Sequence, residues 1–347
     1  MKSKAAVMEG IGKMGIRELD IPEPGEGEVL VRNHKCNICT TDWQTWAGLR
    51  KSQGRKFPWA PGHEMGSEIV AVGKGVNKEL KIGDHVGFGY GFCGECYWCR
   101  RGDTSKCTGE GTSYSYNGLT GSFGMSQYML VPSKMVYKVS LELPWEEAGY
   151  LEPLGTAIRG VRRLRVKPGE NILVIGAGNL GLVNAQAARA FGGRVMVSEI
   201  NEERCGIAES LGFETVNPKK ADVAAWCKEK TDGRGVDGVI LAVGNTAANQ
   251  QALEAVGVTG RILFFAAGYP APEIEVDPNT IHYTEIELIG TYGGDLRDWQ
   301  LAADFLSRGI VKTDKLVSHQ VPLDEVQHAF ELAATPGNYR VSLVLWP

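Results

Sequence analysis

The sequence lacks a long hydrophobic run and carries little net charge, and both absences exclude classes of protein. None of its apolar stretches approaches the roughly 18 residues that a membrane span needs. Residues 1–4 lead into a short strand-like run, not into the apolar core of a signal peptide. A formal net charge of −4 gives no electrostatic attraction to nucleic acid or to an anionic membrane surface. We therefore expect a cytoplasmic protein without membrane or nucleic-acid partners.

Internal repeats, low-complexity segments and linkers rich in proline, glycine or serine are also absent. A chain of 347 residues is long for a single hydrophobic core, so we expect two domains that are not loosely tethered. Its eight cysteines occur in no secreted-looking context, which is typical of a reducing compartment.

Four of the cysteines form a cluster that predicts a metal site. Cys93, Cys96 and Cys99 are each separated by two residues, and Cys107 follows after seven more. Cysteines this close in a tight turn do not readily bond to one another, whereas their sulfurs can all reach one ion at about 2.3 Å. Ferredoxin-like iron–sulfur sequences place the fourth cysteine after three residues and before proline. The spacing therefore favours a structural zinc over an iron–sulfur cluster or a redox dithiol.

The first half of the chain predicts an antiparallel β-domain with long loops, one of which carries the four cysteines. Its short apolar or alternating runs, separated by glycine and proline, lie at residues 29–32, 68–72, 84–87 and 128–131.

From about residue 151 strands, glycine turns and helices alternate, which predicts a parallel sheet with helical crossovers. After residue 290 the pattern becomes mixed, and this tail either extends the parallel sheet or returns to the first domain. Strands are expected at residues 171–175, 194–198, 238–242, 261–266 and 340–345, and helices at 180–191, 299–308 and 323–334.

A glycine-rich turn between an apolar run and a helix predicts a dinucleotide site. Gly176 would make the tight turn, Gly178 would let the backbone approach a pyrophosphate, and Gly181 would let helix and strand pack closely. Asn179 and Leu180 lie in the same turn, where the helix N-terminus presents N–H groups to an anion. The alternative is that the glycines serve packing alone.

Glu199 is expected to select the cofactor. It lies 23 positions after Gly176 and can accept both hydrogen bonds from an adenosine ribose diol. A 2′-phosphate would be repelled by this carboxylate, which favours NAD over NADP, although Arg204 is close enough in sequence to bind a phosphate. The alternative for Glu199 is an ordinary surface acid. Val243 and Gly268, which follow later strand-like runs, are counted with the cofactor site.

Three further segments carry metal-capable side chains beside turn residues. Taken alone, each has an ordinary explanation as a core cysteine, a hydrogen-bonded histidine or an acid at a loop boundary. The segments are Cys39-Thr-Thr41-Asp42, Gly62-His63-Glu64 and Glu152-Pro-Leu154.

Together with the four-cysteine loop and the glycine turn, and in this order, these segments resemble the zinc-dependent medium-chain dehydrogenase/reductase family over essentially the whole chain. The sequence is most similar to the sorbitol, threonine and glucose dehydrogenase branch, because Glu152 stands where the alcohol dehydrogenases proper have cysteine. The resemblance implies an α/β fold with a GroES-like, β-rich catalytic domain and a Rossmann-type, doubly wound parallel sheet. The implied divisions are residues 1–153, 154–294 and 295–347, the last completing the catalytic domain.

The resemblance also implies a ligand set for a second, catalytic zinc. Cys39 and His63 would bind it, with Glu64 or Glu152 supplying a carboxylate. Asp42 would hydrogen-bond the far nitrogen of His63 and fix its tautomer. Each chain would then hold two zinc ions, one catalytic and one structural.

The implied reaction is hydride transfer between NAD and a secondary alcohol such as a polyol or sugar, in a homodimer or homotetramer. Thr41 would contact the substrate hydroxyl, and Thr156 would pack near the nicotinamide. Oxidation of L-threonine or an amino alcohol is the alternative. Metal-free relatives that reduce quinones or activated double bonds, and non-enzymatic NAD-binding relatives, share the two-domain fold. The presence of all the candidate ligands argues against both alternatives.

Some residues depart from the family pattern or have more than one interpretation. Thr40 replaces a glycine, and Gln44 replaces a histidine that can relay protons, so the proton exit route is not predicted. Cys36 and Cys39 match a redox pair but lack its strand-to-helix setting. Trp43 and Trp46 could wall a substrate cleft or belong to the core. The basic residues Arg50, Lys51, Arg55 and Lys56 are interpreted as solvated surface.

Overall fold

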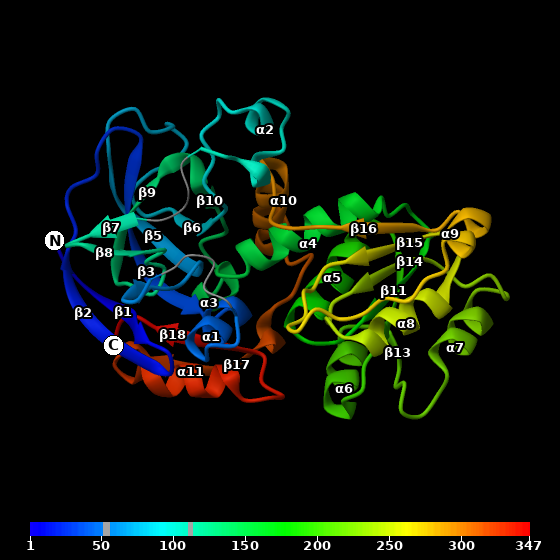
Figure 1. The fold of residues 1–347 in the computed structure, drawn as a ribbon. Helices are drawn as coiled ribbons and strands as arrows, with labels where there is room; N and C mark the ends of the chain where they lie inside the picture. The colour runs from blue at the N-terminus through cyan, green and yellow to red at the C-terminus, as the bar shows by residue number, and fades with distance from the viewer. Residues whose placement is uncertain (51–55, 110–113) are drawn as a thin grey trace. The chain divides into compact units, whose positions relative to one another are not determined.

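The structure is a computed structural model that describes residues 1–50, 56–109 and 114–347, so Lys51 and Arg55 of the basic run lie outside it. The described chain divides into two compact units (Figure 1). One unit combines Met1–Gly155 with Gly294–Pro347, and the other is Thr156–Gly293. The C-terminal tail therefore belongs with the first unit.

Within the described ranges, the first unit contains a five-stranded sheet in the order β2-β1-β4-β8-β7. In its first strand Lys2 and Lys4 are exposed while Ser3 and Ala5 are buried, which is the two-residue period of a half-buried strand. The strands are β1 (Lys2–Gly10), β2 (Lys13–Asp20), β4 (Trp59–Ala60), β7 (Tyr114–Tyr116) and β8 (Leu119–Gly121).

A second sheet in the described part of this unit follows the order β10-β6-β5-β3-β18-β17, with β9 also pairing with β3. The C-terminal strand β18 runs antiparallel to β3, which is how the tail returns to the first unit. The strands are β3 (Glu28–Asn37), β5 (Glu64–Val72), β6 (His85–Phe88), β9 (Tyr128–Pro132), β10 (Val136–Lys138), β17 (Val317–Pro322) and β18 (Arg340–Val344).

Two strand pairs differ from the antiparallel expectation, since β17 pairs with β18 and β4 with β8 in parallel. Parallel neighbours need a crossover connection, and helix α11 (Val326–Ala334) supplies it between β17 and β18. The helix expected at residues 323–334 is thus a short 3-10 turn, Leu323–Glu325, followed by α11. Other helices that position the sites are α1 (Thr40–Trp46), α2 (Tyr97–Arg100), α3 (Trp145–Ala148), α4 (Leu151–Leu164) and α10 (Leu296–Ser307).

The second unit, all of whose residues are described, is built on a six-stranded sheet in the order β13-β12-β11-β14-β15-β16. Every neighbouring pair is parallel, and the order reverses beside β11, which is the doubly wound arrangement that binds dinucleotides at the carboxyl ends of the strands. The strands are β11 (Asn171–Ile175), β12 (Arg194–Ser198), β13 (Glu214–Val216), β14 (Val236–Leu241), β15 (Val256–Phe264) and β16 (Glu287–Gly290).

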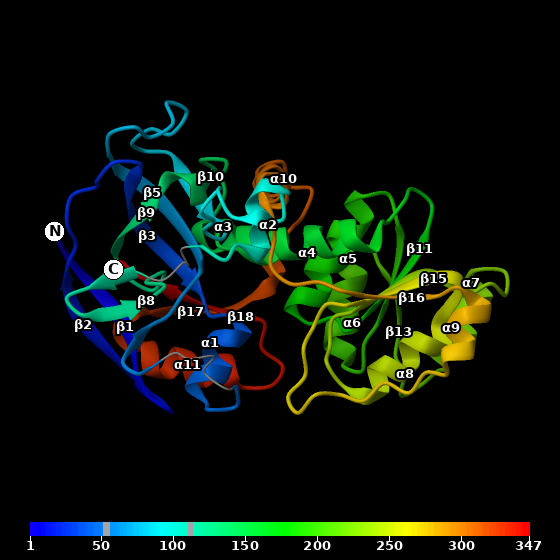
Figure 2. The same cartoon turned by 45° about the horizontal axis from the view of Figure 1, so that its top comes forward.

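Helices lie around this parallel sheet (Figure 2). Residues 172–175 of the central strand are buried, as expected for a strand covered on both faces. The helices are α5 (Asn179–Ala190), α6 (Glu202–Ser210), α7 (Val223–Lys230), α8 (Thr246–Ala255) and α9 (Pro278–Thr284). None of the helices in the described residues combines the length and hydrophobicity that a bilayer span requires.

Candidate active site

Three of the candidate zinc ligands meet in the first unit. One ligand atom each from Cys39, His63 and Glu64 lies within 4.8 Å of the other two. Cys39 directly precedes α1, and Glu64 is the first residue of β5. Segments that are distant in sequence thus bring a thiol, an imidazole and a carboxylate together.

Gly62 shapes the backbone that presents His63. Its φ is +102°, a conformation that side-chain-bearing residues rarely adopt, and a Cβ there would lie 2.5 Å from the backbone nitrogen of Met125. Only glycine fits this approach, so the turn before His63 is fixed by close contact between two backbone segments.

Asp42 faces His63, as expected for a residue that orients a ligand. Its Oδ2 lies 3.5 Å from His63 Nδ1, and its side chain is almost fully buried. Burial lowers the pKa of His63, but the negative charges of Asp42 and Cys39 outweigh burial and raise this pKa well above its usual value. The cluster therefore attracts positive charge.

Arg340, for which the sequence predicts only a position at the start of a strand, binds Glu64. Its Nε and Nη2 donate to Glu64 Oε2 and Oε1 at 2.8 and 2.7 Å, and both side chains are buried. The available signal was a charged residue at the start of a mostly apolar strand, but nothing in the sequence identified its partner. The guanidinium also reaches Thr40 Oγ1 at 3.4 Å.

Glu152 lies in the first turn of α4 and does not join the Cys39–His63–Glu64 group in the part of the chain that the structure describes. Its Oε1 accepts a hydrogen bond from the hydroxyl of Tyr90, a second residue that sequence reasoning missed. Burial raises the pKa of Glu152, and His63 opposes this shift. The structure thus brings Glu64, and not Glu152, closest to Cys39 and His63.

The donor set of the three-residue group fits zinc. Thiolate, imidazole and carboxylate are the ligand types that zinc takes, and three protein ligands leave a fourth position for water or substrate. A fourth protein ligand would leave no position for water or substrate.

Two residues of α1 that were considered for the substrate site differ in burial. Thr41, two positions after Cys39, is half-buried, whereas Trp46 is packed in the core of the unit.

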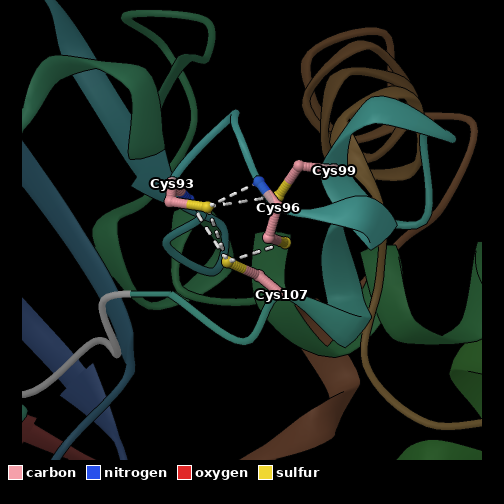
Figure 3. Close-up of side chains that lie close together, drawn as sticks. All are labelled: Cys93, Cys96, Cys99 and Cys107. Carbon is pink, nitrogen blue, oxygen red and sulfur yellow. Dashed lines mark hydrogen bonds between the residues drawn. The ribbon is translucent and has the colours of Figure 1, made fainter.

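The four cysteines of the loop also meet (Figure 3). Cys93 Sγ lies 3.5 Å from Cys107 Sγ and 3.9 Å from Cys99 Sγ, and Cys96 Sγ lies 4.0 Å from Cys107 Sγ. A tetrahedron with zinc–sulfur bonds of about 2.3 Å has edges of about 3.8 Å, so these separations match a structural zinc site.

Backbone N–H groups favour thiolates in this loop. Cys93 Sγ accepts hydrogen bonds from the backbone nitrogens of Cys96 and Glu95, at 3.3 and 3.4 Å. Backbone hydrogen bonds from Cys99 and Thr108 lower the pKa of Cys96 to about 5. Burial instead raises the pKa of Cys99 to about 12, so a bound cation would have to displace the proton of that thiol. The sulfur positions and the backbone donors to Cys93 and Cys96 therefore suit a cation site.

The three glycines of the turn in the second unit are there for different reasons. Gly176 has a φ of +103°, and a Cβ on Gly181 would lie 1.8 Å from the carbonyl oxygen of Gly176. Both glycines are therefore required by the fold itself. A Cβ on Gly178 would meet only Arg204 Nη1, at 3.8 Å, so the fold leaves open the space that a pyrophosphate would use.

Glu199 is tied to this turn. Its Oε2 accepts the N–H of Ala177 at 2.7 Å, and its Oε1 accepts the N–H of Asn201 at 2.9 Å. Each carboxylate oxygen keeps a second lone pair that a ribose hydroxyl could use. Arg204 lies in the first turn of α6, whose N-terminus is capped by the Asn201 side chain.

The remaining residues expected at the cofactor lie at several places in the second unit. A Cβ on Gly176 would lie 2.6 Å from Val243, and a Cβ on Gly268 would lie 2.2 Å from the carbonyl oxygen of Gly244. Val243 and Gly268 therefore lie in the closely packed loops that follow β14 and β15. The half-buried residues of the set are Thr156, Asn179, Leu180, Val243 and Gly268.

Comparison with known proteins agrees with both units. The alcohol dehydrogenase GroES-like domain matches residues 25–141, and the zinc-binding dehydrogenase domain matches residues 180–308. The chain belongs to the zinc-dependent medium-chain dehydrogenase family, as the sequence predicted. It has that family's GroES-like and Rossmann-like α/β fold, and it is a zinc-dependent oxidoreductase.

Two curated relatives cover nearly the whole chain. L-threonine 3-dehydrogenase of Pyrococcus abyssi is 34% identical over 94% of both chains. Sorbitol dehydrogenase of Bacillus subtilis is 31% identical over 99% of this chain and 97% of that one.

Two solved structures are also similar over nearly their full length. A putative zinc-binding dehydrogenase from Sinorhizobium meliloti, bound to NADP, has a TM-score of 0.88 and 27% identity, covering 99% of each chain. Benzyl alcohol dehydrogenase from Acinetobacter calcoaceticus has a TM-score of 0.88 and 25% identity, covering 100% of each chain.

Proposed function

We propose that the protein oxidises a small secondary alcohol, such as a polyol or sugar, with NAD and reduces the matching ketone in reverse. The observation that carries the proposal is the meeting of Cys39, His63 and Glu64 in a chain that also has a dinucleotide turn. Curated relatives named alcohol, sorbitol and D-arabitol-phosphate dehydrogenase support this substrate class.

The residues of the site have separate tasks in this reaction. A zinc ion bound by Cys39, His63 and Glu64 would act as a Lewis acid that lowers the pKa of the substrate hydroxyl. Asp42 fixes the ring of His63, and Arg340 fixes the carboxylate of Glu64. Asp42 and Arg340 thus keep the two zinc ligands in place while the substrate hydroxyl becomes negatively charged.

The oxidation removes a proton from the alcohol O–H and a hydride from the adjacent C–H. We assign the proton to Thr41, whose Oγ1 would accept it while the hydroxyl passes its own proton to solvent or to a cofactor hydroxyl. The amide of Gln44 does not titrate near neutral pH, so proton release would not pass through that side chain. The glycine turn around Gly178 would hold the pyrophosphate of NAD, the cofactor that would supply the hydride acceptor.

L-threonine is a second candidate substrate, because several threonine dehydrogenases are among the relatives at 33–34% identity. A panel of polyols, sugars, hydroxy acids and amino alcohols, screened for NADH formation by absorbance, separates the two. NADH formation with polyols and not with L-threonine supports the first proposal. Oxidation of L-threonine alone would replace it, and no oxidation of any panel member would contradict both.

NAD is the proposed cofactor, because the Glu199 carboxylate lies at the glycine turn where it would repel a 2′-phosphate. Two zinc ions per chain are proposed from the two clusters, one structural and one catalytic.

A homodimer or homotetramer is proposed from the family. The strand β16 lies at the edge of the parallel sheet, where a second subunit could pair, and sedimentation velocity would test the oligomeric state. A cytoplasmic location suits the eight cysteines, all of which are described and free of disulfide bonds, and it can be tested by cell fractionation.

A further inference from the structure

Tyr90 and Trp299 connect Glu152 to the rest of the first unit, and neither belongs to the site residues expected from the sequence. We propose that Tyr90, fixed by Trp299, is a positioning residue that holds Glu152 outside the Cys39–His63–Glu64 group. The inference rests on the proposed function in so far as Glu152 borders the catalytic zinc site. It goes further by assigning that carboxylate a restrained position and by naming what restrains it.

The contact between Tyr90 and Glu152 is direct. The Tyr90 hydroxyl donates to Glu152 Oε1, and the Glu152 side chain is buried. The segment before Glu152 packs against Glu64, because a Cβ on Gly149 would lie 2.6 Å from the carbonyl oxygen of Glu64. Glu152 itself does not join the ligand group in the described residues. Carboxylates are zinc ligands, so a contact that holds this one aside keeps the fourth position open.

Trp299 supplies the rigidity behind this hydrogen bond. Its side chain is 1% exposed, and its ring centroid lies 5.1 Å from that of Tyr90 with an interplanar angle of 59°. Such a tilted arrangement is favourable between aromatic rings. The Tyr90 ring therefore rests against a residue that cannot itself move without disturbing the core.

Three glycines leave room for the indole of Trp299, and two of them lie next to or close to Tyr90 and Glu152 in the sequence. Among the described residues, a Cβ on Gly89, Gly155 or Gly294 would lie 2.6, 2.1 or 2.6 Å from Trp299 ring atoms. Gly89 directly precedes Tyr90, and Gly155 follows Glu152 within α4. One indole thus touches the backbone on both sides of the Tyr90–Glu152 hydrogen bond and fixes their separation.

The helix that carries Trp299 is itself anchored to the four-cysteine loop. Asp295 caps α10, and its Oδ1 accepts the N–H of Ser105 at 2.9 Å and the hydroxyl of Thr104 at 3.4 Å. Contacts therefore run without a break from the structural metal loop through α10 and Trp299 to Tyr90. The position of Glu152 depends on this framework rather than on α4 alone.

The test is a double-mutant cycle with Tyr90→Phe and Glu152→Gln, measured on metal binding as well as on turnover. Tyr90→Phe keeps the ring against Trp299 and removes the hydroxyl, which frees the carboxylate to enter the metal site. We expect a chelating dye to extract the catalytic zinc about tenfold more slowly, and kcat/KM to fall about tenfold. The ligand-field absorption of the Co²⁺-substituted protein should change because an oxygen ligand is added.

In the Glu152→Gln background, Tyr90→Phe should change extraction and kcat/KM by less than about twofold, since the residue on which it acts is gone. Tyr116→Phe is the matched control, because it removes another buried tyrosine hydroxyl, one that donates to Leu130 O at 3.3 Å in the same unit. We expect Tyr116→Phe to leave the Co²⁺ spectrum unchanged. Trp299→Phe should reproduce the Tyr90→Phe spectrum, and if that variant does not fold the Tyr90 cycle still decides.

An unchanged Tyr90→Phe spectrum and extraction rate would overturn the inference. Faster extraction would overturn it too, because Tyr90 would then support metal binding instead of restraining Glu152. Wild-type protein that holds zinc and oxidises an alcohol in the same experiments shows that the proposed function stands even if the inference fails. Wild-type protein without a second zinc would contradict both.

Discussion

Arg340 and Glu64 form a buried bidentate ion pair, with N–O distances of 2.8 and 2.7 Å and side chains that are 5% and 0% exposed. The pKa of Arg340 rises above its ordinary value, because the negative charges of Glu64 and Cys39 outweigh the opposing effect of burial. Arg340 therefore keeps its positive charge in the folded protein. The pair fixes one candidate ligand from a strand at the far end of the chain.

Replacing Arg340 with Met should lower the free energy of unfolding by about 3–5 kcal/mol, since it leaves the Glu64 carboxylate buried without a partner. Urea denaturation measures this. Arg17→Met is the matched control, because Arg17 makes the same two-point contact with Glu9 at side chains that are 43% and 26% exposed. That control should lose no more than about 1 kcal/mol. Equal losses in the two variants would show that the Arg340–Glu64 pair is not special.

Alanine substitutions at two glycines of the cofactor turn should have different effects. Gly181→Ala should destabilise the second unit, because its Cβ would overlap the Gly176 carbonyl oxygen. Gly178→Ala should fold normally, since only Arg204 Nη1 approaches its Cβ, yet it should weaken NADH binding about tenfold or more by filling the pyrophosphate space. Thermal unfolding and NADH fluorescence titration measure the two effects. Unaltered NADH affinity in Gly178→Ala would argue against a pyrophosphate at this turn.

Glu199 should control the choice between NAD and NADP. Glu199→Gln removes the charge while keeping the shape, so the ratio of kcat/KM with NADP to that with NAD should rise about tenfold, equivalent to about 1.4 kcal/mol. Glu203→Gln, at an exposed position of α6, should leave the ratio unchanged. Adding Arg204→Gln should reduce the gain if that guanidinium binds the 2′-phosphate. A ratio that does not move in Glu199→Gln would remove Glu199 from the cofactor site.

Local features of the sequence were more informative than distant ones. The four cysteines and the glycine turn could be interpreted because each set lies within one short segment whose spacing is itself the signal. Arg340 and Glu64 are 276 positions apart, and Tyr90 and Glu152 are 62 apart, so their contacts depend on tertiary packing that no local pattern records.

The fold shows the same distinction. The apolar run at β11 and the alternation around it predicted the parallel sheet, since β11 is largely buried and is followed by the glycine turn and the helix α5. Short strands such as β4 and β8 were not predicted, because two or three residues carry no measurable period. Their parallel pairing joins Trp59 to Thr120, a contact that forms only when the whole sheet closes.

Two partly buried histidines should make stability depend on pH. His34 stacks on Trp145 at 3.9 Å and His85 lies at the same distance from that ring. Burial lowers the pKa of both histidines below the usual 6.5, so the unfolded chain binds these protons first as the pH falls. Their contribution to stability is complete above about pH 6.5 and is lost as the pH falls toward the folded pKa values.

In urea denaturation between pH 7.5 and about pH 5, acidification should therefore cost the wild type more stability than it costs His34→Phe. Phenylalanine keeps a ring against Trp145 but cannot titrate. His328→Phe, at an exposed histidine of α11, is the control and should retain the wild-type slope. A His34→Phe slope equal to that of the wild type would contradict this assignment.

The most direct test measures zinc per chain and alcohol-dependent NADH formation on the same preparations of wild type, Cys39→Ser and Cys107→Ser. Wild type should hold two zinc ions and form NADH. Cys39→Ser should hold one and lose more than about a thousandfold in kcat, since the Lewis acid supplies several kcal/mol. Cys107→Ser should lose the other zinc and unfold at a lower temperature. Undiminished NADH formation by Cys39→Ser after zinc removal would contradict the account.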